Sequence, residues 1–192
     1  MRLEYDKNIP DPKNGDLLIS EPFLNDPNFD RTVILVCENG ADGTFGLVIN
    51  KTTDLLLDEV MNETIDFNGR LNIGGPVEQN TLHYIHRISM PIEGAIPLGN
   101  GIYWSGDYEQ IKALILNGQV SENDIKFYLG YSGWSLGQLR VELDQQSWFV
   151  KPNATARQIF DMDEDALWKS ILHEMGGKYK VFSNYPADPR LN

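Results

Sequence analysis

Two apolar, β-branched runs separated by a short turn-forming segment are the feature that most limits what this chain can fold into. The first run spans residues 32–37 and the second spans residues 45–50, with Asn39-Gly40-Ala41-Asp42-Gly43 between them. Val, Ile and Thr favour extended backbone, and such a segment between two extended runs is typical of a β-hairpin. A hairpin joins antiparallel strands, so the sheet that contains it is predicted to be antiparallel or mixed.

The rest of the chain predicts further short strands mixed with helices. Strands are expected within residues 17–19, 72–77, 82–87, 102–104, 125–131 and 148–150. Helices are expected after an N-cap at Asp54, after an N-cap at Asp107 or Ser105, over residues 138–145, after a capping box of Thr155 and Gln158, and after an N-cap at Asp163. Ser, Thr and Asp favour these cap positions because their side chains accept unpaired backbone N–H groups. Strands and helices do not alternate regularly, so we predict a compact α+β domain with a coiled, mostly antiparallel or mixed sheet and three or four helices.

The chain is long enough for one domain. Its 192 residues suffice for a core without disulfides or structural metal. We predict a single domain over residues 15–182. Residues 1–14 are expected to form a loose N-terminal arm, and residues 183–192, which carry two prolines, a loose C-terminal tail.

The charge balance limits the partners of the chain. Asp and Glu number 28 against 16 Lys and Arg, a formal net charge of -12. Binding to nucleic acid or to an anionic membrane surface requires clustered cations, and the longest basic cluster is Lys178-Tyr179-Lys180. We therefore expect no direct contact with nucleic acid or membranes. The single cysteine, the charged N-terminus and the absence of a long apolar run favour a cytoplasmic protein.

One sequence motif is typical of serine hydrolases. Gly133-Trp134-Ser135-Leu136-Gly137 matches the G-x-S-x-G pattern, and Asp161 and His173 follow it in hydrolase order. The preceding parallel strand–helix units of that fold are missing, and His173 falls within the best-defined helix. A structural role for the segment is favoured, and no catalytic residue is assigned.

The histidines, glycines and the single cysteine give little support for metal, nucleotide or thiol chemistry. His83 and His86 are three residues apart on one predicted strand and so face opposite sides, which argues against a metal site. No glycine-rich phosphate-binding pattern is present, and no cofactor is expected. Cys37 is interpreted as a small core residue, and a reactive thiol is the alternative. The adjacent Glu38 opposes reactivity because a carboxylate raises the pKa of a thiol.

Several motifs in register together resemble one family. They are Gly15-Asp16-Leu17-Leu18-Ile19-Ser20, Phe29 with Arg31-Thr32-Val33, Cys37-Glu38, residues 46–51, Gly74-Gly75-Pro76-Val77, His86, residues 128–134 and Gly137-Gln138-Leu139. Their order and spacing are similar to those of the YqgE/AlgH family of conserved bacterial proteins. The resemblance implies an unusual α+β fold of coiled, bifurcated sheets. Some members carry a transcriptional-regulator label, and the resemblance implies no enzymatic activity or cofactor.

The polar and glycine-rich positions within these motifs are the candidate binding surface. They are Arg31, Asn50, Gly74, Gly75, Pro76, His86, Tyr131, Ser132, Gly133, Trp134, Gln138 and Glu142. We expect Arg31 to pair with Glu142, and Asn50 and Gln138 to satisfy backbone groups. The predicted function is a non-enzymatic regulatory or protein-interaction module that acts through a protein partner or a small ligand, without direct DNA binding. The alternative is a small-ligand-binding protein, or a redox sensor or enzyme that uses the Cys37 thiol.

Overall fold

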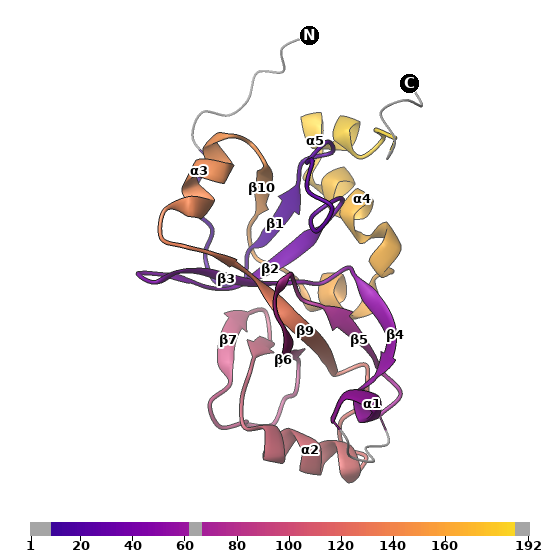
Figure 1. The fold of residues 1–192 in the computed structure, drawn as a ribbon. Helices are drawn as coiled ribbons and strands as arrows, with labels where there is room; N and C mark the ends of the chain where they lie inside the picture. Colours follow the sequence, from indigo (N-terminus) through magenta and orange to yellow (C-terminus); the bar gives the residue numbers. More distant parts are fainter. Residues whose placement is uncertain (1–8, 62–66, 187–192) are drawn as a thin grey trace.

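The structure, a computed structural model, describes residues 9–61 and 67–186 and has the α+β architecture that the sequence predicts (Figure 1). Its strands are β1 (Leu17–Ser20), β2 (Val33–Gly40), β3 (Gly43–Val48), β4 (Thr52–Leu56), β5 (Arg70–Ile73), β6 (Val77–His86), β7 (Ile96–Gly99), β8 (Ile102–Trp104), β9 (Ile125–Trp134) and β10 (Trp148–Lys151). Its helices are α1 (Leu57–Met61), α2 (Tyr108–Leu116), α3 (Gln138–Asp144), α4 (Glu164–Met175) and α5 (Gly177–Phe182), with a π-helical turn at Arg157–Asp161.

The strands form one open sheet that branches at β9. The main path runs β10-β1-β2-β3-β9-β6-β8-β7, and β4 and β5 lie beside it. Strand β9 pairs with β6 along much of its length, with β5 through Tyr128 and Leu129, and with β3 through residues 132–134. Only the β5–β9 pairing is parallel among the described strands. The predicted mostly antiparallel sheet and the β2–β3 hairpin are therefore confirmed.

Strand β1 and residues 33–37 of β2 are buried on both faces, which explains their nearly unbroken apolar sequence. Leu17 packs in one cluster with Trp168 of α4, whereas the next residue, Leu18, packs in another with Leu143 of α3. A third cluster joins α2 to strands β5, β6 and β9. Figure 1 shows the corresponding arrangement, with α4 and α5 on one side of β1 and β2 and α2 at the far end of β9. The side chains of the sheet thus contribute to three separate hydrophobic clusters and not to a single core.

Helices α2 and α4 and the π-helical turn begin at caps that the sequence predicts. Asp107 and Asp163 each accept the backbone N–H three residues further along, at 2.8 and 3.0 Å. Asp107, and not Ser105, is therefore the cap of α2. Thr155 and Gln158 form the reciprocal capping box, with N–H to oxygen distances of 3.0 and 3.3 Å. In the described part of the chain, no helix has both the length and the apolar character needed to cross a membrane.

The predicted helix cap at Asp54 is wrong. Asp54 lies within strand β4, and helix α1 starts only at Leu57. The β-branched Thr52 pairs with Asn72 of β5, so strand pairing across the chain overrides the local capping signal. The side chain of Asp54 instead lies 3.2 Å from the guanidinium of Arg70.

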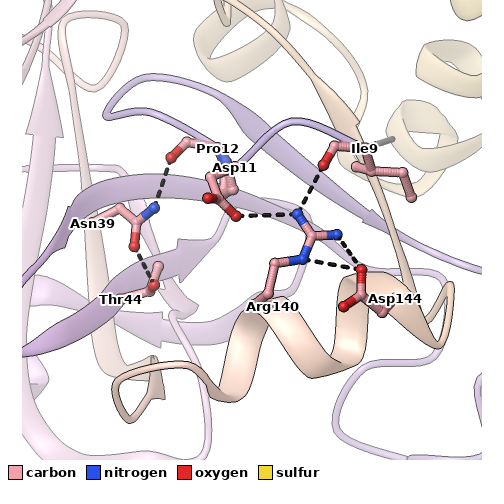
Figure 2. A network of polar contacts seen from close by, with 7 residues as sticks. All are labelled: Ile9, Asp11, Pro12, Asn39, Thr44, Arg140 and Asp144. Carbon is pink, nitrogen blue, oxygen red and sulfur yellow. Dashed lines mark hydrogen bonds and ion pairs between the residues drawn. The ribbon is translucent and has the colours of Figure 1, made fainter. Parts of the chain in front are cut away.

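Residues 9–14 are tied to the domain instead of forming a loose arm, as Figure 2 shows. Arg140 of α3 donates to the carbonyl oxygen of Ile9 at 2.8 Å and pairs with Asp11 at 3.1 Å and with Asp144 at 2.7 Å. Asn39 of the hairpin donates to the carbonyl oxygen of Pro12 at 2.7 Å. The segment therefore straps α3 to the β2–β3 hairpin. The rest of the predicted arm, residues 1–8, lies outside the described residues.

The C-terminal end also packs on the domain as far as residue 186. Gly176 ends α4 as predicted, but a further helix, α5, follows where the sequence predicted none. Ser183 is buried, and Arg31 donates to the carbonyl oxygen of Tyr185 at 2.6 Å. Residues 183–186 are thus held in place and not loose. Residues 187–192 lie outside the described part of the chain.

Candidate functional site

A cavity of about 430 Å³ lies where the β2–β3 hairpin packs against the C-terminal end of β9. It is lined by Glu38, Gly40, Asp42, Gly43, Thr44, Phe45, Val77, Tyr131, Gly133, Trp134 and Ser135. Gly43 allows the close approach, because a Cβ there would lie 2.2 Å from the carbonyl oxygen of Trp134. Thr44 pairs directly with Trp134, which fixes the register of the hairpin on β9. We call this space the hairpin cavity.

An aromatic cluster borders the hairpin cavity and lines it through Phe45 and Tyr131. Phe45 is stacked by Trp104 and Tyr131, with ring centroids 4.8 and 4.7 Å away, and by the edge of His83 at 5.1 Å. Burial lowers the pKa of His83, and the nearby Glu78 carboxylate opposes this more weakly. The imidazole is therefore neutral at neutral pH, and the cluster is an uncharged, π-rich surface.

Two carboxylates line the same cavity. Glu38 lies directly across the hairpin from Phe45, just after a register shift between Val36 and Glu38, and Asp42 lies in the turn. Both side chains are exposed, and none of the described residues that line the cavity is basic. Carboxylates beside aromatic rings suit a cationic group on an apolar stem, because the charge lies near the acids and the stem packs on the rings.

The glycine-rich end of β9 supplies the predicted residues that reach this cavity. Tyr131, Gly133 and Trp134 line it directly. Ser132 points the other way, is fully buried, and donates its hydroxyl to the carbonyl oxygen of Gly74 at 3.1 Å. Of the four candidate positions in this segment, three therefore line the cavity and one supports the strand from behind.

Gly74 and Gly75 lie behind β9 and outside the hairpin cavity. A Cβ on Gly74 would lie 2.2 Å from the carbonyl oxygen of Gly130, and one on Gly75 would lie 2.2 Å from the carbonyl carbon of Tyr131. The backbone of Gly74 is also hydrogen-bonded to β9, since its N–H donates to the carbonyl oxygen of Leu129 at 2.8 Å. The backbone of β9 therefore occupies the space next to both glycines. Pro76 follows as an exposed residue before β6.

Gln138 and Glu142 belong to α3, next to Trp134. Glu142 accepts the indole N–H of Trp134 and that of Trp148, each at 2.8 Å, on one carboxylate oxygen. Its other oxygen accepts from the Gln138 amide at 3.0 Å. Gln138 also accepts the backbone N–H of Ser135 at 3.1 Å, which confirms its predicted role in satisfying backbone.

The expected ion pair between Arg31 and Glu142 is not formed. Arg31 lies over the ring of Trp168, 4.7 Å from its centroid, on the α4 side of the sheet. Glu142 is satisfied instead by indole and amide donors, which hold it on the α3 side. Asn50 accepts the N–H of Val33 and donates to the carbonyl oxygen of Arg31, at 2.8 and 2.9 Å, so its predicted role is confirmed. Neither Arg31 nor Asn50 lines the hairpin cavity.

His86 lies apart from the hairpin cavity and from the side chains of Arg31 and Glu142. It lies at the end of β6, its ring stacks on Tyr103 of β8 at 5.5 Å, and its Nε2 lies 3.1 Å from the carbonyl oxygen of Ser105. His83 packs instead on Phe45, so the two histidines face opposite sides of β6 as predicted.

The Cys37 thiol is in the wrong place for redox chemistry. Its side chain is fully buried in the cluster that faces α4, and its sulfur donates to the carbonyl oxygen of Leu35 at 3.7 Å. Burial strongly raises the pKa of the thiol, and the Glu38 carboxylate raises it further. This geometry supports the interpretation of Cys37 as a core residue.

We expect iodoacetamide to leave Cys37 unmodified in the folded protein at pH 8 and to alkylate it after unfolding in urea. Thiolate is the reacting form, and burial removes both thiolate and access. Mass spectrometry measures the adduct. Alkylation at similar rates in both states would contradict the core placement.

The raised pKa of the Cys37 thiol also predicts that the stability of the protein depends on pH. Because the thiol pKa is higher in the folded state, the unfolded chain loses this proton first, and the free energy of unfolding falls as pH rises above about 8.5. Cys37→Ala is expected to remove this contribution. Urea unfolding of both proteins between pH 7.5 and 9.5 measures the difference.

Ser135 and His173 do not meet in a serine-hydrolase triad. Ser135 is exposed, and its hydroxyl donates to the Gln138 side chain at 3.2 Å. His173 is exposed on α4, which packs on the opposite side of β1 and β2 from α3. The nucleophile and base of such a triad must lie within hydrogen-bond reach.

Sequence reasoning missed several residues of the hairpin cavity. Glu38, Asp42 and Phe45 belong to the predicted hairpin but carried no binding assignment. Trp104, which stacks on Phe45 without lining the cavity, comes from a distant strand. One acid near the end of β2 and one within the hairpin turn were the visible signal. The stacking of Trp104 on Phe45 had no visible signal in the sequence. It depends on the pairing of β6 with both β8 and β9.

The chain is similar to known proteins over nearly its whole length. A family model described as AlgH-like matches residues 17–180. A UPF0301 protein of Cytophaga hutchinsonii is 41% identical over 179 residues, which cover 93% of this chain and 98% of the relative. A UPF0301 protein of Chlorobium limicola is 37% identical over 189 residues, 98% of each chain.

Two solved structures share the fold. The solution structure of the AlgH protein from Pseudomonas aeruginosa has a TM-score of 0.71 and 25% identity, and covers 95% of this chain and 98% of that one. The crystal structure of protein DIP2367 from Corynebacterium diphtheriae has a TM-score of 0.76 and 22% identity, and covers 93% of this chain and 95% of that one. From its sequence, its branched sheet and these relatives, the chain belongs to the AlgH-like family.

Proposed function

We propose that this protein is a non-enzymatic interaction module that recognises a cationic segment of a partner protein at the hairpin cavity. In this proposal, regulation acts through that partner and not through direct contact with DNA. The observation that carries the proposal is the meeting of the Glu38 and Asp42 carboxylates with the rings of Phe45 and Tyr131 in one cavity. An arginine or lysine side chain satisfies both parts of this surface at once.

The overall charge supports the same choice of partner. A net charge of -12 repels polyphosphate backbones and attracts basic segments over a distance set by ionic strength. The cavity itself carries acids without a basic residue among its described lining. Rim charges of this kind add mainly to association rate and selectivity, so the binding is expected to weaken at high salt.

A small cationic molecule is the second candidate for the same cavity. The volume of about 430 Å³ is within the range of small-molecule pockets. The two candidates differ in reach, because a peptide also contacts the surface around the cavity whereas a small molecule does not. A thiol-based activity receives no support from the buried Cys37.

We expect a Leu-Arg-Leu-Arg peptide amide to bind more tightly than free arginine amide, and the double variant Glu38→Gln, Asp42→Asn to weaken the peptide about tenfold. The two amides keep nearly the same shape but carry no charge, so the attraction to the arginine side chains is lost. Trp134 in the cavity wall provides a fluorescence signal, and calorimetry gives the affinity.

The matched control is Glu109→Gln with Glu122→Gln, which removes the same charge from exposed positions on α2 and the loop before β9. It is expected to change the affinity less than twofold. Equal weakening by both double variants would show only non-specific attraction and would contradict the site. Equal affinity for the peptide and arginine amide would favour the small-molecule candidate.

A further inference from the structure

A second cavity, of about 260 Å³, lies between α3, the C-terminal end of β9 and the loop before β2. Its walls include Asp26, Phe29, Gly133, Trp134, Glu142 and Trp148. Gly133 and Trp134 also line the hairpin cavity, so the two cavities meet at the end of β9. We call this second space the α3 cavity.

The two cavities belong to opposite faces of β9. Gly133 pairs directly with Phe45 of β3, so residue 133 lies on the face of the hairpin cavity. Successive residues of a strand point to opposite faces, and the side chain of Trp134 therefore points to the other face. There its indole N–H donates to Glu142 of α3 at 2.8 Å.

The edge of β9 between the two cavities has no strand partner. Strand β6 pairs with β9 no further than Tyr131, which lies opposite Val77. Residues 132–134 pair with β3 alone among the described strands, so their other edge is unpaired. Gly133 is exposed and has no side chain to cover this edge. An extended segment of another chain can lie along such an edge as an added strand, which is a common mode of peptide recognition.

The α3 cavity, like the hairpin cavity, is acidic. Asp26 and Glu142 line it, and the described residues of its wall include no basic one. The groups bonded to Glu142 are neutral indole and amide N–H groups, so no cation in that network neutralises it. Lys51 lies near Asp26, but its ammonium group donates to the carbonyl oxygen of Asn28 at 2.7 Å and does not line the cavity. A third cavity, which shares part of the hairpin with the first, is lined by Arg140 and so suits a second cation less well.

We propose that the hairpin cavity and the α3 cavity together bind an extended segment of the partner protein with two adjacent basic residues, one side chain in each cavity. This proposal rests on the proposed function of the hairpin cavity and adds the sequence pattern of the partner. In a strand along the free edge of β9, consecutive side chains point to opposite faces and reach both cavities. Basic residues separated by one position point to the same face and reach only one. Each cavity offers its cation two carboxylates and offers the apolar stem an aromatic ring.

Two peptide amides of the same composition, Leu-Arg-Arg-Leu and Leu-Arg-Leu-Arg, test this pattern on the full chain. They carry the same charge, so non-specific attraction is equal for both. Calorimetry is expected to show that Leu-Arg-Arg-Leu binds about fivefold more tightly. Asp26→Asn with Glu142→Gln is expected to abolish this preference and to change the affinity for Leu-Arg-Leu-Arg less than twofold. The charge-matched control, Glu109→Gln with Glu122→Gln, is expected to keep the preference.

The outcomes separate this proposal from the proposed function. Equal affinity of the two peptides for the native protein, or a preference that survives Asp26→Asn with Glu142→Gln, overturns the two-cavity proposal. Loss of the preference in the control variant overturns it as well. The hairpin cavity itself still stands in these cases if Glu38→Gln with Asp42→Asn weakens Leu-Arg-Leu-Arg. If that variant weakens neither peptide, or if neither peptide binds, both proposals fail. Asp26→Asn alone leaves Glu142 with its indole partners and is expected to lower the preference about twofold, which keeps the test available if the double variant does not fold.

Discussion

Replacing Glu142 with alanine is expected to lower the free energy of unfolding by about 3 kcal/mol. Glu142 accepts the indole N–H groups of Trp134 and Trp148, which are only 5% and 1% exposed. Removal of the carboxylate leaves two largely buried donors without a partner, and each costs about 1–3 kcal/mol. Urea unfolding followed by circular dichroism measures the change without relying on the tryptophans themselves.

Two variants on the same helix separate this network from a general effect of α3. Glu142→Gln keeps a carbonyl oxygen that accepts both indoles, so its cost is expected to be less than half that of alanine. Asp144→Ala removes an exposed ion pair with Arg140, and its cost is expected to stay below about 1 kcal/mol. If Glu142→Ala costs no more than Asp144→Ala, the two indoles do not depend on this carboxylate.

Local features of the fold were predictable because their causes are local. The Asp107 and Asp163 caps and the Thr155–Gln158 capping box act within four residues, and the structure confirms all three. The β2–β3 hairpin is similar, since its turn and its two apolar runs are contiguous. Asp54 shows the limit, because a cap signal of the same kind lost to strand pairing with a segment further along the chain.

The candidate site was only partly predictable because its parts meet through distant pairings. Tyr131, Gly133 and Trp134 were predicted from the sequence as part of a binding surface, and all three line the hairpin cavity. No local pattern shows that Phe45 stacks between Trp104 and Tyr131, which come from three different strands. The same holds for Arg31 and Glu142, where opposite charge suggested a pair that the two faces of the sheet keep apart.

Gly74→Ala is expected to destabilise the protein by about 3 kcal/mol or more. A Cβ at this position would lie 2.2 Å from the carbonyl oxygen of Gly130 and 2.8 Å from the side chain of Leu47. The backbone of Gly74 cannot retreat without loss, because its N–H donates to Leu129 and its carbonyl accepts from Val48, both at 2.8 Å. The added Cβ would therefore clash with backbone atoms. The hydrogen bonds on both sides of Gly74 prevent the small shift that would relieve a clash with a flexible side chain.

Gly40→Ala is the matched control, because a Cβ there meets nothing within 4 Å and its φ is not in the left-handed region. Its effect is expected to stay within about 0.5 kcal/mol, as for most surface changes. Urea midpoints of both variants give the comparison. Since Gly74 supports the stretch of β9 that presents Tyr131, any folded Gly74→Ala protein is also expected to bind the peptide probe more weakly. Equal stability of the two variants would mean that β9 lies further from residue 74 than the structure places it.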